Sequence, residues 1–188
     1  DPVSPGCRAN SAMIWALRSF VSNLPLLASF AYCRLDLNLA QQVPASNVRP
    51  RERGGLVLLT GLPGSGKTTF ARRLLARLPP PARHLESDAI RRLLFPRPTY
   101  TADESARVFQ EVGRQAEAAL GERELVIVDA TNLTERDRRR FYALAMRLAV
   151  PLVAVRLVAP ERTIRERLER PREGFSEAGV QVFEEMRG

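Results

Sequence analysis

Residues 61–68, Gly-Leu-Pro-Gly-Ser-Gly-Lys-Thr, have the residue types and the spacing of a loop that binds phosphate groups. They match the pattern G-x-x-x-x-G-K-[ST] at every required position. Glycines let the backbone curl so that successive N–H groups face one anionic centre, and the dipole of the following helix adds positive potential there. Lys67 can reach the β and γ phosphates, and the Thr68 hydroxyl can bind magnesium. The motif therefore predicts a site for ATP and Mg2+.

We expect the nucleotide to be bound by a run of consecutive residues: Gly61, Leu62, Pro63, Gly64, Ser65, Gly66, Lys67, Thr68 and Thr69. Lys67 is the only lysine in a chain with 29 basic residues. A general compositional preference for arginine would have placed arginine here as well. The only lysine therefore lies at the position where the phosphate-binding motif requires one.

Asp129 ends the apolar run 125–128, where a P-loop protein holds its second magnesium-linked acid. An aspartate at a strand end can also simply begin a turn, but beside a P-loop we favour the metal-linked role. Thr68 and Asp129 are thus the predicted metal ligands. Thr131 and Asn132 follow, and they either position a phosphate or start the next loop.

Asp88 and Arg91 could form the place where a phosphoryl acceptor binds. One helical turn separates them, so they share a helix face. A carboxylate that accepts a hydroxyl proton, beside a cation that holds an anionic group, suits such an acceptor. Asp88 could instead be a helix cap, with Arg91 on a solvated face.

Arginines are dense between residues 160 and 175, where a basic lid could close over the transferring group and exclude water. They could equally form ion pairs on an exposed amphipathic helix, with Glu161, Glu166 and Glu169 as partners. The arginines in question are Arg162, Arg165, Arg167, Arg170 and Arg172.

The elements that must hold these residues alternate along the chain. Strands are expected at residues 56–60, 83–86, 125–128 and 151–158, and helices at 67–78, 88–94, 103–120, 134–149, 160–169 and 176–186. Thr134 and Asp137 have the spacing of a capping box. This alternation predicts the α/β class, a P-loop NTPase three-layer sandwich with a central parallel sheet. Its last strand is expected beyond Gly188, so that residues 54–188 form a C-terminally truncated ATP-binding domain.

Residues 1–53 differ in composition, and we interpret them as a poorly ordered extension and linker. Arg18 breaks their apolar stretch, which disfavours a membrane-spanning helix or a secretory signal. An amphipathic segment that binds a membrane or a partner is the alternative. Both cysteines, Cys7 and Cys33, lie there, which favours a reducing, cytoplasmic location. The single histidine, His84, is expected to be an ordinary packed side chain on which no metal site can be built.

The net charge is +8 and the pI is about 10.8, which admits nucleic acid as a partner. The arginines are spread along the whole chain, so we do not favour that partner on charge alone. No membrane partner is expected, and the sequence does not indicate an oligomeric state.

Four segments together resemble P-loop kinase-like proteins related to polynucleotide kinases and zeta toxins, and more closely the AAA-type predicted ATP-binding kinases. These segments are 61–68, 86–95, 128–132 and 159–162, and the resemblance covers about residues 56–186. It implies that Asp88 is the general base, that Arg91 binds the acceptor, and that Arg167 is a lid arginine. The second lid arginine is Arg170 or Arg172, of which we choose Arg170. The family's last strand and base-binding loop are absent from the sequence.

The resulting hypothesis is a kinase that transfers the γ-phosphoryl group of ATP to a hydroxyl group, on a small molecule or on a nucleic-acid 5′ end. Lys67, Asp88, Arg91, Arg167 and Arg170 are its predicted catalytic residues. The alternative hypothesis is a switch that hydrolyses ATP and regulates a partner without phosphorylating an acceptor.

Overall fold

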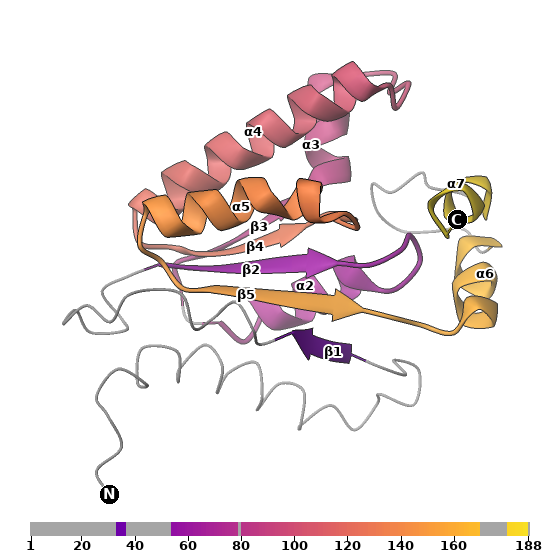
Figure 1. Ribbon diagram of the computed structural model, residues 1–188, viewed down its shortest axis with the longest axis horizontal. Coiled ribbons are helices and arrows are strands. Elements are labelled where there is room, and N and C mark those ends of the chain that lie inside the picture. Colours follow the sequence, from indigo (N-terminus) through magenta and orange to yellow (C-terminus); the bar gives the residue numbers. More distant parts are fainter. Residues whose placement is uncertain (1–32, 37–53, 79, 170–179, 188) are drawn as a thin grey trace, which may run out of the picture.

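Short apolar runs form the strands of one sheet, and amphipathic segments between them form the helices that cover it (Figure 1). The computed structural model describes residues 33–36, 54–78, 80–169 and 180–187. In chain order the elements are β1 (Cys33–Asp36), β2 (Gly55–Thr60), α2 (Lys67–Leu75), β3 (Ala82–Glu86), α3 (Ser87–Leu94), α4 (Ala102–Gly121), β4 (Leu125–Asp129), α5 (Glu135–Arg147), β5 (Leu152–Leu157), α6 (Glu161–Glu169) and α7 (Val180–Arg187).

The sheet has the order β1-β5-β2-β4-β3. The strands from β2 to β5 are all parallel, as the sequence predicts. Their carboxyl ends therefore share one edge, where ligands of open α/β sheets bind.

β1 pairs with β5 in the antiparallel direction, with Cys33 opposite Leu157. The sequence analysis did not predict this strand, although apolar Cys33 and Leu35 alternate with polar Arg34 and Asp36, because the segment was interpreted as part of a poorly ordered extension. Within the described residues no strand follows β5, so β1 holds the sheet edge beside it. The predicted strand beyond Gly188 stays a prediction.

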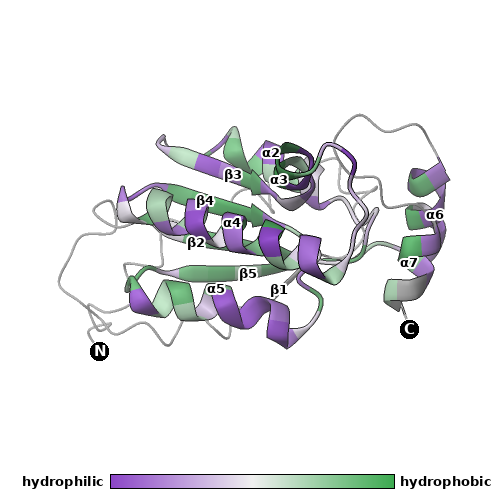
Figure 2. Ribbon diagram, turned by 90° about the horizontal axis from the view of Figure 1, so that it is seen from above, coloured by the Kyte–Doolittle hydropathy of each residue, from purple (hydrophilic) through white to green (hydrophobic). Residues whose placement is uncertain are grey.

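Two apolar layers enclose the sheet. On one face, alternate strand residues pack against α3, α4 and α5, with Val108, Val112 and Phe141 fully buried. On the other face, Phe70, Ala71 and Leu74 of α2 pack against the remaining strand residues. Figure 2 shows the strands β2, β4 and β5 as largely hydrophobic, whereas α4 and α5 mix hydrophobic and hydrophilic positions. The predicted three-layer arrangement is confirmed.

The predicted helices agree with the structure to within a few residues. The capping box of α5 is present, because the Thr134 hydroxyl accepts from the Asp137 amide and the Asp137 carboxylate accepts from the Thr134 amide. α2 ends at Leu75 rather than at residue 78, and a turn precedes the prolines. α7 begins at Val180, and residues 176–179 of the predicted last helix lie outside the described residues.

Candidate functional site

The phosphate-type loop lies between β2 and α2, at the carboxyl edge of the sheet. Gly61, Gly64 and Gly66 have φ values of 145°, 76° and 98°, a region that residues with a Cβ rarely adopt. A Cβ on Gly61 would also meet the Leu157 carbonyl oxygen at 2.4 Å. The loop can therefore curl only because glycine stands at these positions. All the residues predicted to bind nucleotide, from Gly61 to Thr69, lie in this loop or in the first turn of α2.

Lys67 is folded back under the loop. Its Nζ donates to the carbonyl oxygens of Gly61 at 2.9 Å and Leu62 at 3.0 Å. Burial lowers the pKa of the Lys67 ammonium, and the nearby carboxylates of Asp129 and Asp88 oppose that shift. A cation held by two neutral carbonyls and partly desolvated is poised to accept anionic oxygens as ligands.

A further observation supports the binding of a phosphate group by this loop. The Ser65 hydroxyl is buried and has no hydrogen-bond partner within the described structure. A buried hydroxyl without a partner is costly, and a ligand oxygen would satisfy it. Thr68, the predicted magnesium ligand, follows Lys67 in the first turn of α2.

Asp129, the second predicted metal ligand, ends β4, and its side chain is only 3% exposed. His84 Nε2 lies 3.1 Å from Asp129 Oδ2, and the Glu86 carboxylate is close to both. Desolvation raises the pKa of Glu86, and the negative charge of Asp129 adds to that rise. The expectation that no metal site can be built on His84 is wrong, because strand pairing brings two carboxylates to its ring. Sequence spacing alone could not show this, since Asp129 lies on another strand.

Asn132 joins the end of β4 to β2. Its Nδ2 donates to the Leu59 carbonyl at 2.9 Å, and its own carbonyl accepts from the Thr60 hydroxyl at 3.0 Å. The Thr131 carbonyl accepts from the Gly61 amide at 3.0 Å. Of the two interpretations left open for these residues, their contacts favour a structural one, because they hold the start of the phosphate loop.

Asp88 lies in the first turn of α3, half-buried, and the N-cap position belongs to Glu86. The alternative interpretation of Asp88 as a helix cap is therefore not supported. Asp88 directly follows β3, at the same carboxyl edge of the sheet as the phosphate loop, and its negative charge opposes the lowering of the Lys67 pKa and adds to the rise of the Glu86 pKa.

Arg91 is buried, and its guanidinium contacts α4 and the loop before it. It lies 3.4 Å from Glu104 Oε2, donates to the Ser105 hydroxyl at 3.1 Å, and stacks on the Tyr100 ring at 4.7 Å. Its Nε is buried without a hydrogen-bond partner in the described structure. In this arrangement Arg91 anchors the loop that precedes α4, so the alternative interpretation of Arg91 on a solvated face is wrong, whereas its role as an acceptor ligand stays a prediction.

α6 packs directly on the phosphate loop. Ile164 and Leu168 approach Gly64 so closely that a Cβ there would lie 3.1 Å from each side chain. Arg167 of the same helix donates to the Gly64 carbonyl at 3.2 Å, which places one predicted lid arginine at the loop. Arg170, the other, lies outside the described residues.

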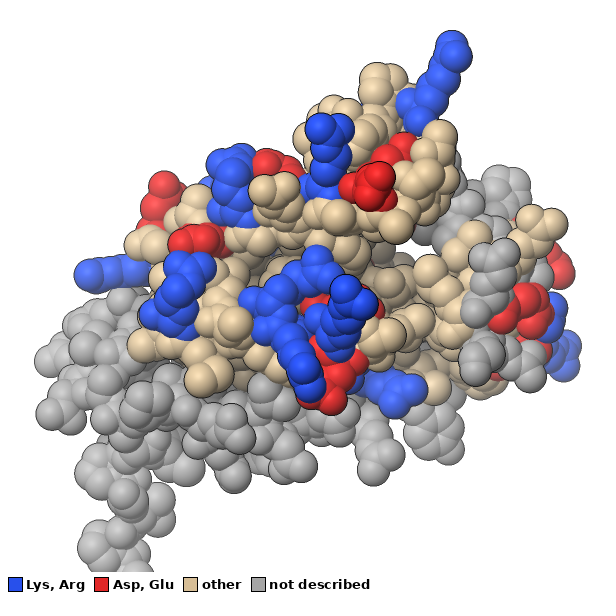
Figure 3. All heavy atoms as spheres, turned by 45° about the horizontal axis from the view of Figure 1, so that its top comes forward, with Lys and Arg blue, Asp and Glu red and all other residues tan. Residues whose placement is uncertain are grey.

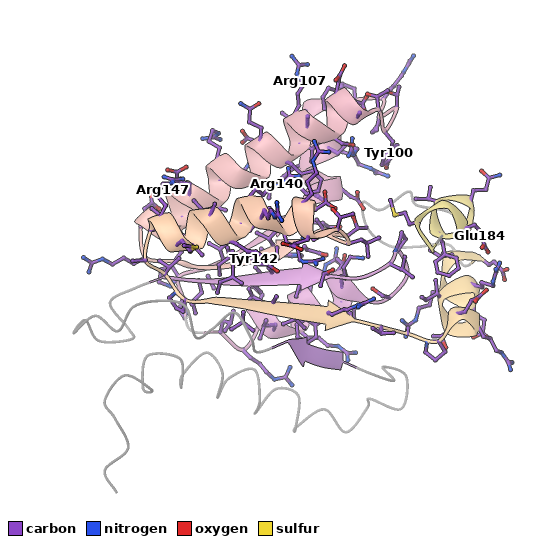
Figure 4. The ribbon with its side chains drawn as sticks, in the orientation of Figure 1. Tyr100, Arg107, Arg140, Tyr142, Arg147 and Glu184 are labelled. Atoms are coloured by element: carbon purple, nitrogen blue, oxygen red, sulfur yellow. The ribbon has the colours of Figure 1, made fainter. Side chains whose placement is uncertain are left out.

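Most arginines of α5 have acidic partners. Figure 3 shows arginine and acidic side chains interspersed over the face that carries α4 and α5. Arg147 bonds Glu117 at 2.6 Å, and Arg139 bonds Glu135 at 3.1 Å. Arg140 lies between the two helices, with its guanidinium 4.4 Å from the centroid of the Phe109 ring (Figure 4).

Comparisons with known proteins agree on one family and fold. The family described as an AAA domain matches residues 56–188. A chain of the Pnkp1/Rnl/Hen1 complex is 23% identical with a TM-score of 0.57, over 70% of this chain and 44% of that one. The Mycobacterium tuberculosis APS kinase CysC, solved with AMPPNP and APS, is 24% identical with a TM-score of 0.53, over 63% of this chain and 70% of that one.

Kti12 from Chaetomium thermophilum, solved with ADP-AlF3, is 24% identical with a TM-score of 0.53, over 69% of this chain and 77% of that one. The chain spans less than half the length of its Pnkp1/Rnl/Hen1 relative. No curated protein matches the sequence. None of the helices in the described part of the chain has the length and the apolar character needed to cross a bilayer.

The family match extends over more than half of the chain and begins at β2, so it includes the phosphate loop, Asp88 and Asp129. The chain therefore belongs to the AAA domain family and has a P-loop kinase-like fold.

Proposed function

We propose that the protein is a kinase that transfers the γ-phosphoryl group of ATP to a hydroxyl group of an acceptor. The observation that carries the proposal is the phosphate loop at the carboxyl edge of the sheet, where Lys67 is held by two loop carbonyls, Asp129 ends the neighbouring β4 and Asp88 begins α3. A protein that only hydrolyses ATP as a switch needs the metal-linked acid but has no use for a second carboxylate that faces an acceptor.

The residues of the loop would hold the nucleotide. Backbone N–H groups between Gly61 and Thr69 surround the phosphates, and Lys67 leaves the Gly61 and Leu62 carbonyls to bind phosphate oxygens. Thr68 and Asp129 hold Mg2+. Bound ATP supplies the γ-phosphoryl group, and Mg2+ neutralises charge on its oxygens.

Asp88 takes the proton of the acceptor hydroxyl. Its place at the start of α3 lets the carboxylate face the phosphate loop while staying half-buried. Partial burial keeps water away and strengthens the interactions of any charged group in the site. The acceptor is a hydroxylated molecule, and its chemical class is chosen by residues around Asp88.

Arg167 stabilises charge that develops on the transferring group. It already contacts the phosphate loop through the Gly64 carbonyl, and α6 packs on that loop, so a small shift of α6 would move the guanidinium onto a bound phosphate. Arg170 is proposed for the same task from the family resemblance. We assign Arg91 an indirect part, because its contacts fix the loop from Thr99 to Thr101 beside the acceptor.

The test is ATP consumption by the purified chain with Mg2+, measured with and without acceptors. The panel holds 5′-hydroxyl oligonucleotides, nucleotide sugars, aminoglycosides and small sugars. A kinase gives a rate that depends on one acceptor class, and Lys67→Ala abolishes that rate. Slow hydrolysis that no acceptor stimulates would favour the switch instead.

Asp88→Asn separates the two functions further. It should reduce acceptor phosphorylation at least 100-fold, because general base catalysis contributes about 10²–10⁴ in rate. ATP binding, measured by thermal melting, should survive. Asp103→Asn is the matched control, since Asp103 is an exposed acid in the first turn of α4. Equal turnover in both variants would refute the role of Asp88.

A further inference from the structure

The pairing of β3 with β4 brings three metal-binding side chains to one face of the sheet. Side chains alternate along a strand, so His84 and Glu86 point to the same face, while Leu85 between them is buried in the opposite core. In the parallel register Glu86 is the partner of Asp129 on β4. The three side chains therefore meet on the face that α2 covers.

Their geometry is that of a cluster of ligands. One ligand atom from each of His84, Glu86 and Asp129 lies within 4.8 Å of the other two. The side chains are 11%, 10% and 3% exposed, respectively. Two carboxylates buried side by side repel each other, and either a proton on one of them or a cation between them relieves that repulsion.

Two cationic side chains of the described residues lie near the cluster. Lys67 Nζ donates to the Gly61 and Leu62 carbonyls. Arg72 approaches Glu86 only to 3.9 Å, and its side chain is 53% exposed, so it can move into solvent without loss of packing. A small divalent ion would replace the His84–Asp129 hydrogen bond within the cluster and the long Arg72–Glu86 contact at its exposed side.

The donor set indicates the kind of ion. Mg2+ prefers oxygen ligands and octahedral geometry, whereas an imidazole nitrogen suits first-row transition metals. We propose that His84, Glu86 and Asp129 form a site for a divalent transition metal such as Mn2+, and that it binds the ion before any nucleotide arrives. This proposal depends on the proposed function at one point only, because Asp129 is a metal ligand in both.

Mn2+ is the probe, with the chain freed of any tag and of nucleotide. Electron paramagnetic resonance measures binding, because free Mn2+ gives a sharp six-line signal that is lost on binding. Pulsed measurements then detect coupling to an imidazole nitrogen. The chain has a single histidine, so such coupling can come only from His84. One equivalent of bound Mn2+ with nitrogen coupling, not displaced by a tenfold excess of Mg2+, is the expected result.

His84→Phe keeps a ring of similar size and should weaken Mn2+ binding at least tenfold and abolish the nitrogen coupling. If that variant does not fold, Glu86→Gln provides the same test of affinity. The control is Glu111→Gln, which changes an acid on α4 outside the cluster and should bind Mn2+ as the parent does. Bound Mn2+ without nitrogen coupling, or binding that requires ATP, would overturn the proposal.

Lys67→Ala keeps this test separate from the proposed function. This variant should lose ATP binding but retain the Mn2+ site, because Lys67 is not one of its ligands. A chain that binds Mn2+ but phosphorylates nothing would sink the kinase proposal alone. A chain that phosphorylates an acceptor with Mg2+ but binds no Mn2+ without nucleotide would sink the metal proposal alone.

Discussion

Asn132 offers a sharp test of how the phosphate loop is held, because two separable features act at one residue. The side chain is fully buried, and its Nδ2 donates to the Leu59 carbonyl at 2.9 Å. The backbone has a φ of 43°, which asparagine tolerates better than most residues. Asn132→Ala removes the hydrogen bond and also strains the backbone. Asn132→Gly removes the hydrogen bond alone.

The two costs can be estimated separately. Leaving a buried acceptor without a partner costs about 1–3 kcal/mol. A residue with a Cβ in the left-handed region costs roughly 1–2 kcal/mol of folding free energy. Glycine avoids that strain, but its more flexible unfolded chain lowers the stability by about 0.4–1 kcal/mol. Asn132 Oδ1 has no partner within the described structure, so its removal costs no further hydrogen bond. We expect Asn132→Ala to lose about 2–4 kcal/mol and Asn132→Gly about 1 kcal/mol less.

Urea unfolding followed by circular dichroism measures both free energies of unfolding. Since Asn132 lies beside the loop and not in it, ATP should stabilise the Gly variant by nearly as much as the parent. Equal losses in the two variants would show that the strain of a Cβ in the left-handed region is no larger than the entropic cost of glycine, about 0.4–1 kcal/mol. A loss below about 0.5 kcal/mol in both would refute the idea that Asn132 holds β4 to β2.

Three further predictions follow from single contacts. Gly61→Ala should cost more than about 2 kcal/mol in thermal or urea unfolding, because its Cβ would meet the Leu157 carbonyl oxygen at 2.4 Å. Arg167→Ala should lower kcat for acceptor phosphorylation about 100-fold with nucleotide affinity nearly unchanged, and an unchanged kcat would remove Arg167 from the site. Hydrogen bonds from Arg83 hold the pKa of Glu124 below its usual value. Above pH 4.5 the parent should therefore be more stable than Glu124→Gln. Unfolding measured at decreasing pH should show that difference disappear as the pH falls through the lowered pKa of the folded state.

The fold and the phosphate loop were predictable because their signals are local. The loop motif needs only its own residues, and each buried strand shows as a short apolar run bounded by glycine, proline or charged residues. The helix boundaries near Thr134 and Asp137 follow from a pattern within four residues. Each of these features is determined by residues within a single helical turn or a single strand.

The site could be predicted only in part, because much of it depends on contacts between distant segments. Spacing suggested that Arg91 shares a face with Asp88, but the position of α4 decides that Arg91 is buried against Glu104. His84 looked ordinary because its partner Asp129 is 45 residues away and meets it only through strand register. β1 has an alternating apolar and polar pattern, but only its antiparallel pairing with β5, more than 100 residues away, places it in the sheet.

The solitary lysine has a practical consequence. Lys67 lies beneath the phosphate loop with its Nζ bonded to two loop carbonyls, and its pKa is lowered. An amine-selective reagent can therefore label only one side chain of the protein, in addition to the amino terminus. Because burial and two hydrogen bonds keep a reagent away from this amine, the yield of that single adduct measures how readily the loop opens. If an added nucleotide protects Lys67 from the reagent, the degree of protection measures occupancy of the nucleotide site, without any knowledge of the acceptor.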